Sequence, residues 1–193
     1  MGQQVDLLKE FLEAGNPADQ GGLDRVRLGS DKVVVYMFTS IAEKVDLHFC
    51  SEADINDYVL CNGNGCILCQ IGRNLDQRWL MAVYMPEARA VAVLPVSLSQ
   101  RPHALLPQLL DVLKIPEPQV VFIRRGLREH YRVEARPIPA DCDAGERAIS
   151  AFLAAYKAGT IQLDSVYSKI SNEDLARSTA IADRLRLKGI KVE

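Results

Sequence analysis

No apolar run in the sequence approaches the roughly 18–20 residues that a membrane-spanning helix needs. The first residues, Met-Gly-Gln-Gln-Val-Asp, hold neither a basic nor an apolar segment, so we expect no secretory signal and a cytoplasmic protein without a membrane partner. The sequence also lacks three common catalytic motifs. These are the phosphate loop Gly-x-x-x-x-Gly-Lys-Ser/Thr, the nucleophile motif Gly-x-Ser-x-Gly and the zinc-protease motif His-Glu-x-x-His. These absences predict a protein that is not an enzyme.

The charge of the chain is nearly balanced overall but uneven along its length. The 193 residues carry a net charge of −2, with 48% hydrophobic and 25% charged residues, which is typical of a soluble globular protein. Residues 1–72 carry 5 basic and 11 acidic groups, residues 73–136 carry 10 and 6, and residues 137–193 carry 8 and 8. The positive excess therefore falls on the middle of the chain.

The pattern of β-branched, aromatic and turn residues predicts strands in the middle of the chain and helices toward both ends. Helices are expected over residues 5–14, from Ser99 to Leu113, over 144–158 and from Ser171 to about Lys188, with a linker at 15–24. Strands are expected over 32–39 and 45–50, and in two hairpins formed by 78–85 with 89–96 and by 119–124 with 130–136.

This order of elements favours a mainly β fold with helices, namely a five-stranded, OB-like Greek-key barrel with an insertion between its first and second strands. Runs of strands with one helix also fit other α+β folds. We expect three parts: an N-terminal helix and linker at 1–24, the barrel at 25–140 with a zinc knuckle at 48–69, and a helical extension at 141–193. The C-terminal helices are amphipathic and need a partner surface, which is the barrel, each other or another chain.

Three cysteines, Cys61, Cys66 and Cys69, lie within nine residues that also contain two glycines. Three thiolates and one further ligand form the closed tetrahedral site of a structural zinc, and the odd total of five cysteines fits disulfides badly. His48 and Cys50 lie upstream on one face of a predicted strand, and either can supply the fourth ligand. Ordinary buried thiols and a redox Cys-x-x-Cys pair are the alternatives.

An OB barrel binds single-stranded nucleic acid by stacking bases on aromatic rings while cations contact the phosphates. Strand alternation places Phe122 and Arg124 on one face of 119–124 and separates Tyr131 from Arg132 in the strand that follows. Aromatic residues in barrel strands are more often core than surface, and outward arginines are often only solvated. The candidate stacking residues are Tyr36, Phe38, Trp79, Tyr84, Phe122 and Tyr131, and the candidate phosphate contacts are Arg73, Arg78, Arg124, Arg125, Arg128 and Arg132, together with Arg89 and Arg136.

The sequence resembles the zinc-containing single-stranded-DNA-binding proteins of tailed bacteriophages in the order of its potential ligands and the strand after them. That order is His48, Cys61, Cys66-x-x-Cys69 and then the run from Arg78 to Tyr84. The run from Phe122 to Gly126, followed by Tyr131-Arg132-Val133, is similar to the strand-glycine-strand pattern of that family, and the resemblance covers roughly residues 30–137.

This resemblance implies an OB barrel, a structural zinc held by His48 with the three clustered cysteines, and single-stranded DNA as the partner in replication, recombination or repair. The sequence does not separate DNA from RNA. A second hypothesis is a zinc-stabilised module for protein interaction or self-association, which uses the C-terminal helices and binds no nucleic acid.

Overall fold

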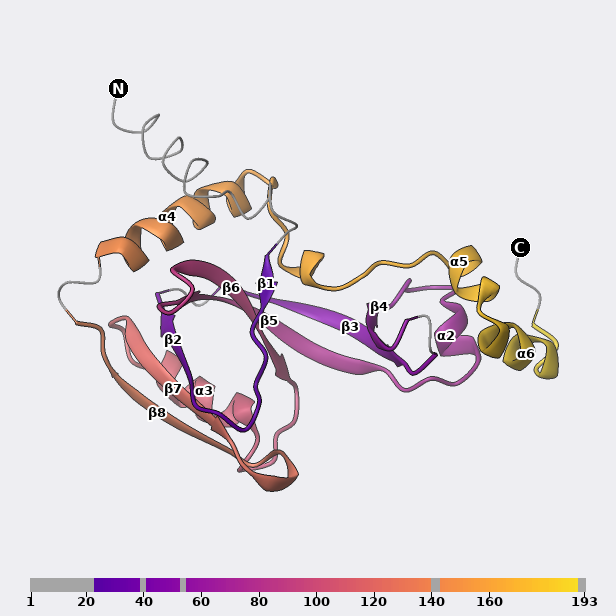
Figure 1. Ribbon diagram of the computed structural model, residues 1–193, viewed down its shortest axis with the longest axis horizontal. Helices are drawn as coiled ribbons and strands as arrows, with labels where there is room; N and C mark the ends of the chain where they lie inside the picture. The colour runs from indigo at the N-terminus through magenta and orange to yellow at the C-terminus, as the bar shows by residue number, and fades with distance from the viewer. Residues whose placement is uncertain (1–22, 39–40, 53–54, 140–142, 191–193) are drawn as a thin grey trace. The chain divides into compact units, whose positions relative to one another are not determined.

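The computed structural model describes residues 23–38, 41–52, 55–139 and 143–190, which form a mixed α/β fold (Figure 1). The predicted helix over 5–14 and most of the predicted linker lie outside the described residues. The strands are β1 (Asp24–Arg25), β2 (Val33–Met37), β3 (Ala42–Cys50), β4 (Asp57–Leu60), β5 (Asp76–Met85), β6 (Ala90–Ser97), β7 (Gln119–Arg125) and β8 (Tyr131–Pro137). The helices are α2 (Ile67–Gln70), α3 (Leu105–Leu113), α4 (Asp143–Lys157), α5 (Asn172–Arg177) and α6 (Thr179–Leu187), with 3-10 turns at Leu127–Glu129 and Leu163–Val166. Within the described part of the chain, no helix is both long and apolar enough to cross a lipid bilayer.

The chain divides into two compact units. Within the described residues, unit 1 consists of 23–43 and Trp79–Val166, and unit 2 consists of Lys44–Arg78 and 167–190. This division differs from the three predicted parts, because the cysteine-rich insertion belongs to unit 2 and the C-terminal extension is shared between the units. The reason lies in packing: α4 contacts β6 in unit 1, whereas α5 and α6 contribute to the hydrophobic core of unit 2.

Unit 1 is built on a sheet whose strands follow the order β1-β6-β5-β2-β7-β8. The central strand β2 is antiparallel to β5, with Tyr36 opposite Tyr84, and antiparallel to β7, with Val35 opposite Val121. β7 and β8 are antiparallel neighbours, and β5 and β6 are neighbours as well, so both predicted hairpins are confirmed. The short strand β1, which runs parallel to β6, was not predicted.

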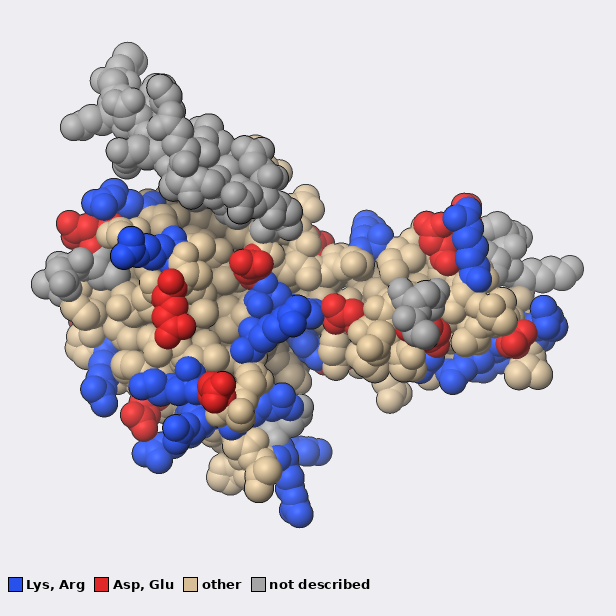
Figure 2. Space-filling view, in the orientation of Figure 1, with Lys and Arg blue, Asp and Glu red and all other residues tan. Residues whose placement is uncertain are grey.

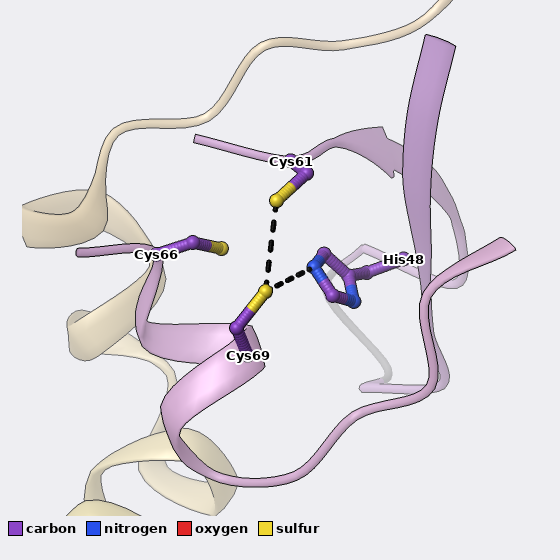
Figure 3. A group of neighbouring side chains, drawn as sticks. All are labelled: His48, Cys61, Cys66 and Cys69. Carbon is purple, nitrogen blue, oxygen red and sulfur yellow. Dashed lines mark hydrogen bonds between the residues drawn. The ribbon is translucent and has the colours of Figure 1, made fainter. Parts of the chain in front are cut away.

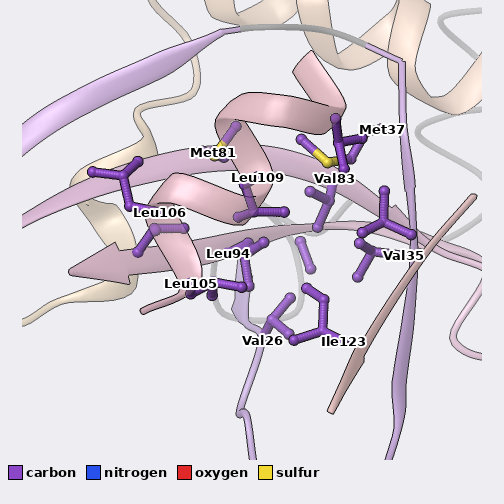
Figure 4. Close-up of a cluster of buried hydrophobic side chains, with 14 residues drawn as sticks. Val26, Val35, Met37, Met81, Val83, Leu94, Leu105, Leu106, Leu109 and Ile123 are labelled. Atoms are coloured by element: carbon purple, nitrogen blue, oxygen red, sulfur yellow. The ribbon is translucent and has the colours of Figure 1, made fainter. Parts of the chain in front are cut away.

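One face of this sheet packs with α3 to form the core of unit 1 (Figure 4). Alternation along the strands sends Val35 of β2 and Ile123 of β7 to this face, where they join Leu109 of α3. All three side chains have no exposed surface. The residues that alternate with these core residues along β2, β7 and β8 therefore lie on the opposite face of the sheet.

Two helices differ from their predicted bounds. α3 begins at Leu105 rather than at Ser99, so Pro107 lies in the first turn, where its missing N–H costs no helical hydrogen bond. The predicted helix from 171 to 188 is two helices, because Ser178 between α5 and α6 has extended backbone angles, φ −65° and ψ 121°. The Ser171 hydroxyl accepts a hydrogen bond from the Asp174 N–H, which caps α5.

The side chain of Gln108 covers the outer edge of β8, where the strand order ends. Its Nε2 donates to the Tyr131 carbonyl at 2.8 Å, and its Oε1 accepts from the Val133 N–H at 3.0 Å. The His103 carbonyl accepts from the Tyr131 N–H at 2.8 Å. These bonds take the place of a further strand at this edge, and among the described residues the pairings do not confirm the closed five-stranded barrel that the sequence predicts.

We expect Gln108→Ala to lower the free energy of unfolding by about 1–3 kcal/mol, because it leaves a backbone donor and acceptor of β8 without partners. Chemical unfolding followed by the fluorescence of Trp79 measures this. Gln100→Ala is the control, since Gln100 is exposed in the segment before α3. Equal stability of the two variants would mean that the Gln108 amide does not support the β8 edge.

Unit 2 is built around β3 and β4, which are antiparallel with Leu47 opposite Leu60. The strand over 45–50 is confirmed and extends back to Ala42, whereas β4 was not predicted. α5 and α6 contact each other, and their apolar faces share a hydrophobic core with the segment that follows β4. The core of unit 2 consists of Cys50, Val59, Cys66, Ile67, Leu68, Ile71, Leu175, Ile181 and Leu185.

Candidate functional site

Four potential metal ligands from three separate stretches of unit 2 converge on one point (Figure 3). One ligand atom from each of His48, Cys61, Cys66 and Cys69 lies within 4.8 Å of all the others. His48 belongs to β3, and Cys61 follows β4. Cys66 is the N-cap of the short helix α2, and Cys69 lies within that helix. The structure therefore brings together the four residues that the sequence and the resemblance single out.

The turn between Cys61 and Cys66 is made by glycines with left-handed backbone angles. Gly63 has φ 70° and Gly65 has φ 87°, a region that side chains with a Cβ atom rarely adopt. The Cys66 N–H donates to the Gly63 carbonyl at 3.1 Å, and the Cys61 N–H donates to the Asp46 carbonyl at 2.9 Å. These bonds fold the chain back so that both sulfurs face the imidazole of His48.

The spacing of the ligand atoms fits a tetrahedral zinc ion. The Sγ atoms of Cys61 and Cys69 are 3.6 Å apart, and the Cys69 Sγ lies 3.3 Å from the Nε2 of His48. Usual zinc–ligand lengths place two thiolates about 3.8 Å apart and a thiolate about 3.6 Å from an imidazole nitrogen. The donor set and its dimensions therefore suit zinc with all four positions filled by protein, which is a structural rather than a catalytic arrangement.

The imidazole of His48 is oriented by the backbone. His48 is fully buried, and its Nδ1–H donates to the Asn74 carbonyl at 3.1 Å. This bond fixes the tautomer in which Nε2 keeps its lone pair and faces the sulfurs, as metal-binding histidines require. The sequence left His48 and Cys50 open as the fourth ligand. Cys50 instead packs in the hydrophobic core of unit 2.

The crowded sulfurs perturb one another. Partial desolvation and the neighbouring Cys61 and Cys66 raise the pKa of Cys69 to about 12. Desolvation also opposes ionisation of Cys66, but hydrogen bonds from backbone groups at Cys69, Asn62 and Leu68 outweigh it and lower the pKa of Cys66. Each negative charge on these sulfurs penalises the next, so a cation among them would stabilise the three thiolates.

Asn172, at the start of α5, supports the knuckle from the far end of the chain. Its Oδ1 accepts from the Ile67 N–H at 3.2 Å and from the Asn62 side chain at 3.0 Å, and its Nδ2 donates to the Gly65 carbonyl at 3.1 Å. Asn62 also donates to the Ile170 carbonyl at 2.9 Å. Sequence reasoning missed both asparagines, since nothing in the local pattern links positions more than 100 residues apart.

The predicted nucleic-acid-binding residues fall into different environments in the structure. Five of them are at least partly exposed, and the register of β2, β7 and β8 places them on the sheet face opposite the core. They are Tyr36, Phe38, Phe122, Arg124 and Arg132. Trp79 and Tyr131 pack against the core of unit 1, and Tyr84 is buried. Arg125 is half-buried and donates from Nη1 to the Leu28 carbonyl at 3.4 Å, whereas Arg128 is exposed with φ 57°.

Arg73 and Arg78 belong to unit 2, and each contacts a carboxylate. Arg73 forms an ion pair with the buried Glu52. Arg78 donates from Nη2 to the Asp76 carboxylate at 2.6 Å, and its guanidinium lies 4.0 Å from the centre of the Tyr58 ring. Desolvation opposes the charge of Arg78, but its bond to Asp76 outweighs this effect and raises the pKa of the guanidinium. Both arginines thus have protein partners for their charge.

Comparison of the chain with protein-family models, curated proteins and solved structures found no match. Two features of the described residues bear on function, namely the four-ligand centre of unit 2 and the sheet of unit 1.

Proposed function

We propose that this protein binds single-stranded nucleic acid through an OB-like barrel and carries one structural zinc. The observation that carries the proposal is the strand pairing of unit 1. Five of its strands, in chain order β2, β5, β6, β7 and β8, are joined by the pairings β2–β5, β5–β6, β2–β7 and β7–β8, and α3 connects the third strand to the fourth. A partly open Greek-key barrel with this order is the OB arrangement, which binds oligonucleotides in many proteins.

The zinc centre has a structural part in this proposal. His48, Cys61, Cys66 and Cys69 would hold the ion, which supplies a cross-link within unit 2 and takes no part in a reaction. The residues from β3 to the start of β5 occupy the connection between the first and second barrel strands, a position that contributes to oligonucleotide binding in OB folds. The partner class is unpaired DNA or RNA, and DNA in replication, recombination or repair is the form that the family resemblance favours.

Fluorescence anisotropy with labelled oligo-dT tests the proposal, because this homopolymer cannot pair with itself. We expect a Kd in the micromolar range or below at about 50 mM salt, and a marked loss of affinity at about 200 mM, because bound cations release counterions from the phosphates. A duplex of the same length serves as the comparison and should bind more weakly. Absence of an anisotropy change with oligo-dT at low salt would reject the proposed function.

A further inference from the structure

The surface of an OB barrel that most often binds oligonucleotides is covered in this protein. That surface is the outward face of the second and third strands, here β5 and β6. Five residues on β5 and β6 alternate with the core residues and therefore lie on the outward face, yet all of them are buried. They are Leu80, Ala82 and Tyr84 of β5, and Val91 and Val93 of β6. α4 packs against β6, and Ile149 and Phe152 of α4 are buried as well.

Most of the described residues on the outward face of β2, β7 and β8 are instead at least partly exposed. Pairing between β2 and β7 puts Val34 opposite Phe122 and Tyr36 opposite Val120. Tyr36 and Phe122 are half-buried, and the Tyr36 ring lies 6.2 Å from that of Phe38 and 5.9 Å from that of Tyr84. This face thus carries a strip of partly exposed apolar and aromatic side chains, namely Val34, Tyr36, Phe38 and Phe122.

Cations border this strip. The Nζ of Lys32 lies 4.5 Å and the guanidinium of Arg136 lies 5.3 Å from the centre of the Phe122 ring. Arg124 is directly opposite Arg132 in the register of β7 and β8, where two like charges destabilise the sheet unless an anion balances them. Figure 2 shows Lys and Arg side chains gathered over the part of unit 1 that contains β7 and β8.

The acidic residue on this stretch of β8 offsets little of the positive charge. Glu134 pairs with Arg132 at 3.1 Å, but the Arg132 side chain is 80% exposed, so solvent screens the pair. Lys32 and Arg136 therefore lie over the Phe122 ring, and Arg124 and Arg132 add two further cations to the same face. A polyanion with unpaired, planar bases complements both the charge and the rings, whereas a duplex presents phosphates but keeps its bases stacked inside.

We infer that the outward face of β2, β7 and β8 is the single-strand-binding surface of this protein. Bases stack on Tyr36, Phe38 and Phe122, and phosphates contact Lys32, Arg124, Arg132 and Arg136. The inference rests on the proposed function and assigns it to a face other than the outward face of β5 and β6. It also gives a role to Lys32, which strand patterning did not select.

Charge reversal tests the phosphate contacts. Four contacts predict a slope of log affinity against log salt of about −2.8, and Arg124→Glu/Arg132→Glu should reduce its magnitude by about 1.4 and weaken oligo-dT binding at least tenfold at low salt. The matched control is Arg177→Glu/Arg184→Glu, which changes the net charge equally on α5 and α6, outside unit 1. The control should keep both the affinity and the slope of the unmodified protein.

Removal of the rings tests the base contacts separately. Phe122→Leu and Tyr36→Leu keep an apolar side chain and should each weaken oligo-dT binding by about 5-fold to 150-fold, which is the cost of losing one stacked base. Binding of heparin, a polyanion without bases, should be unchanged in these two variants. Thermal unfolding checks that each variant keeps the fold.

The outcomes separate the two proposals. If the unmodified protein binds oligo-dT and the face variants bind it equally well, the assigned face is wrong and the proposed function stands. If the charge variant loses affinity while both ring variants keep theirs, the face binds polyanions in general and the inference fails. If the unmodified protein does not bind oligo-dT, the function and the face fail together.

Discussion

Replacing Cys66 with serine is expected to abolish stoichiometric zinc binding and to unfold unit 2. The core of unit 2 is small, and a core of this size gains much of its stability from a metal or a disulfide. A structural zinc contributes on the order of 10 kcal/mol to the folding of such a unit, far more than its hydrophobic core alone. Hydrogen exchange should therefore lose its protection in residues 44–78 and 167–190, while α3 and β7 in unit 1 keep theirs.

Cys50→Ala is the matched control for this experiment. Cys50 has no exposed surface and lies in the same core, but its sulfur does not belong to the four-ligand cluster. We expect this variant to retain one zinc per chain and to lose only about 1 kcal/mol of stability. If Cys66→Ser kept its zinc, or lost the zinc while residues 167–190 stayed protected, the cross-linking role assigned to the metal would be wrong.

Substitution of Leu109 by alanine is expected to destabilise unit 1 by about 2–5 kcal/mol. Leu109 has no exposed surface and packs among Val35, Met81 and Ile123, so truncation leaves a cavity in the core between α3 and the sheet. Its neighbour Leu110 on the same helix is 44% exposed, and Leu110→Ala should cost well under 1 kcal/mol.

Urea unfolding of the two variants measures the difference, with Trp79 as the fluorescent probe. Both variants remove the same atoms from adjacent positions of α3, so helix propensity cancels and burial alone separates them. Similar losses at the two positions would show that the face of α3 assigned to the core is wrong.

The alternation of side chains between the two faces of β7 and β8 was predictable from sequence, and it determines which of their residues lie on the outward face. The sequence predicts Phe122 and Arg124 on one face and Tyr131 apart from Arg132, and the register shows this arrangement. The three cysteines were predictable too, because short spacing and glycines confine them to one turn. Their convergence with His48 followed from the family resemblance, since strand parity alone left Cys50 as an alternative.

Contacts between distant segments were beyond the reach of local patterns. Nothing in the sequence near Asn172 indicates that its amide bonds to the knuckle at Gly65, and nothing near Gln108 indicates that it occupies the edge of β8. The amphipathic pattern of α4 shows that one face must be buried, but not that the sheet around β6 buries it. That contact covers the outward side of the sheet around β6.

Native mass spectrometry of the full chain, mixed with oligo-dT at low ionic strength, measures zinc content and oligonucleotide binding on one preparation. We expect a protein ion that carries one zinc, together with a complex that contains the zinc-bound chain and one oligonucleotide. A spectrum of metal-free protein with no oligonucleotide complex would contradict this expectation.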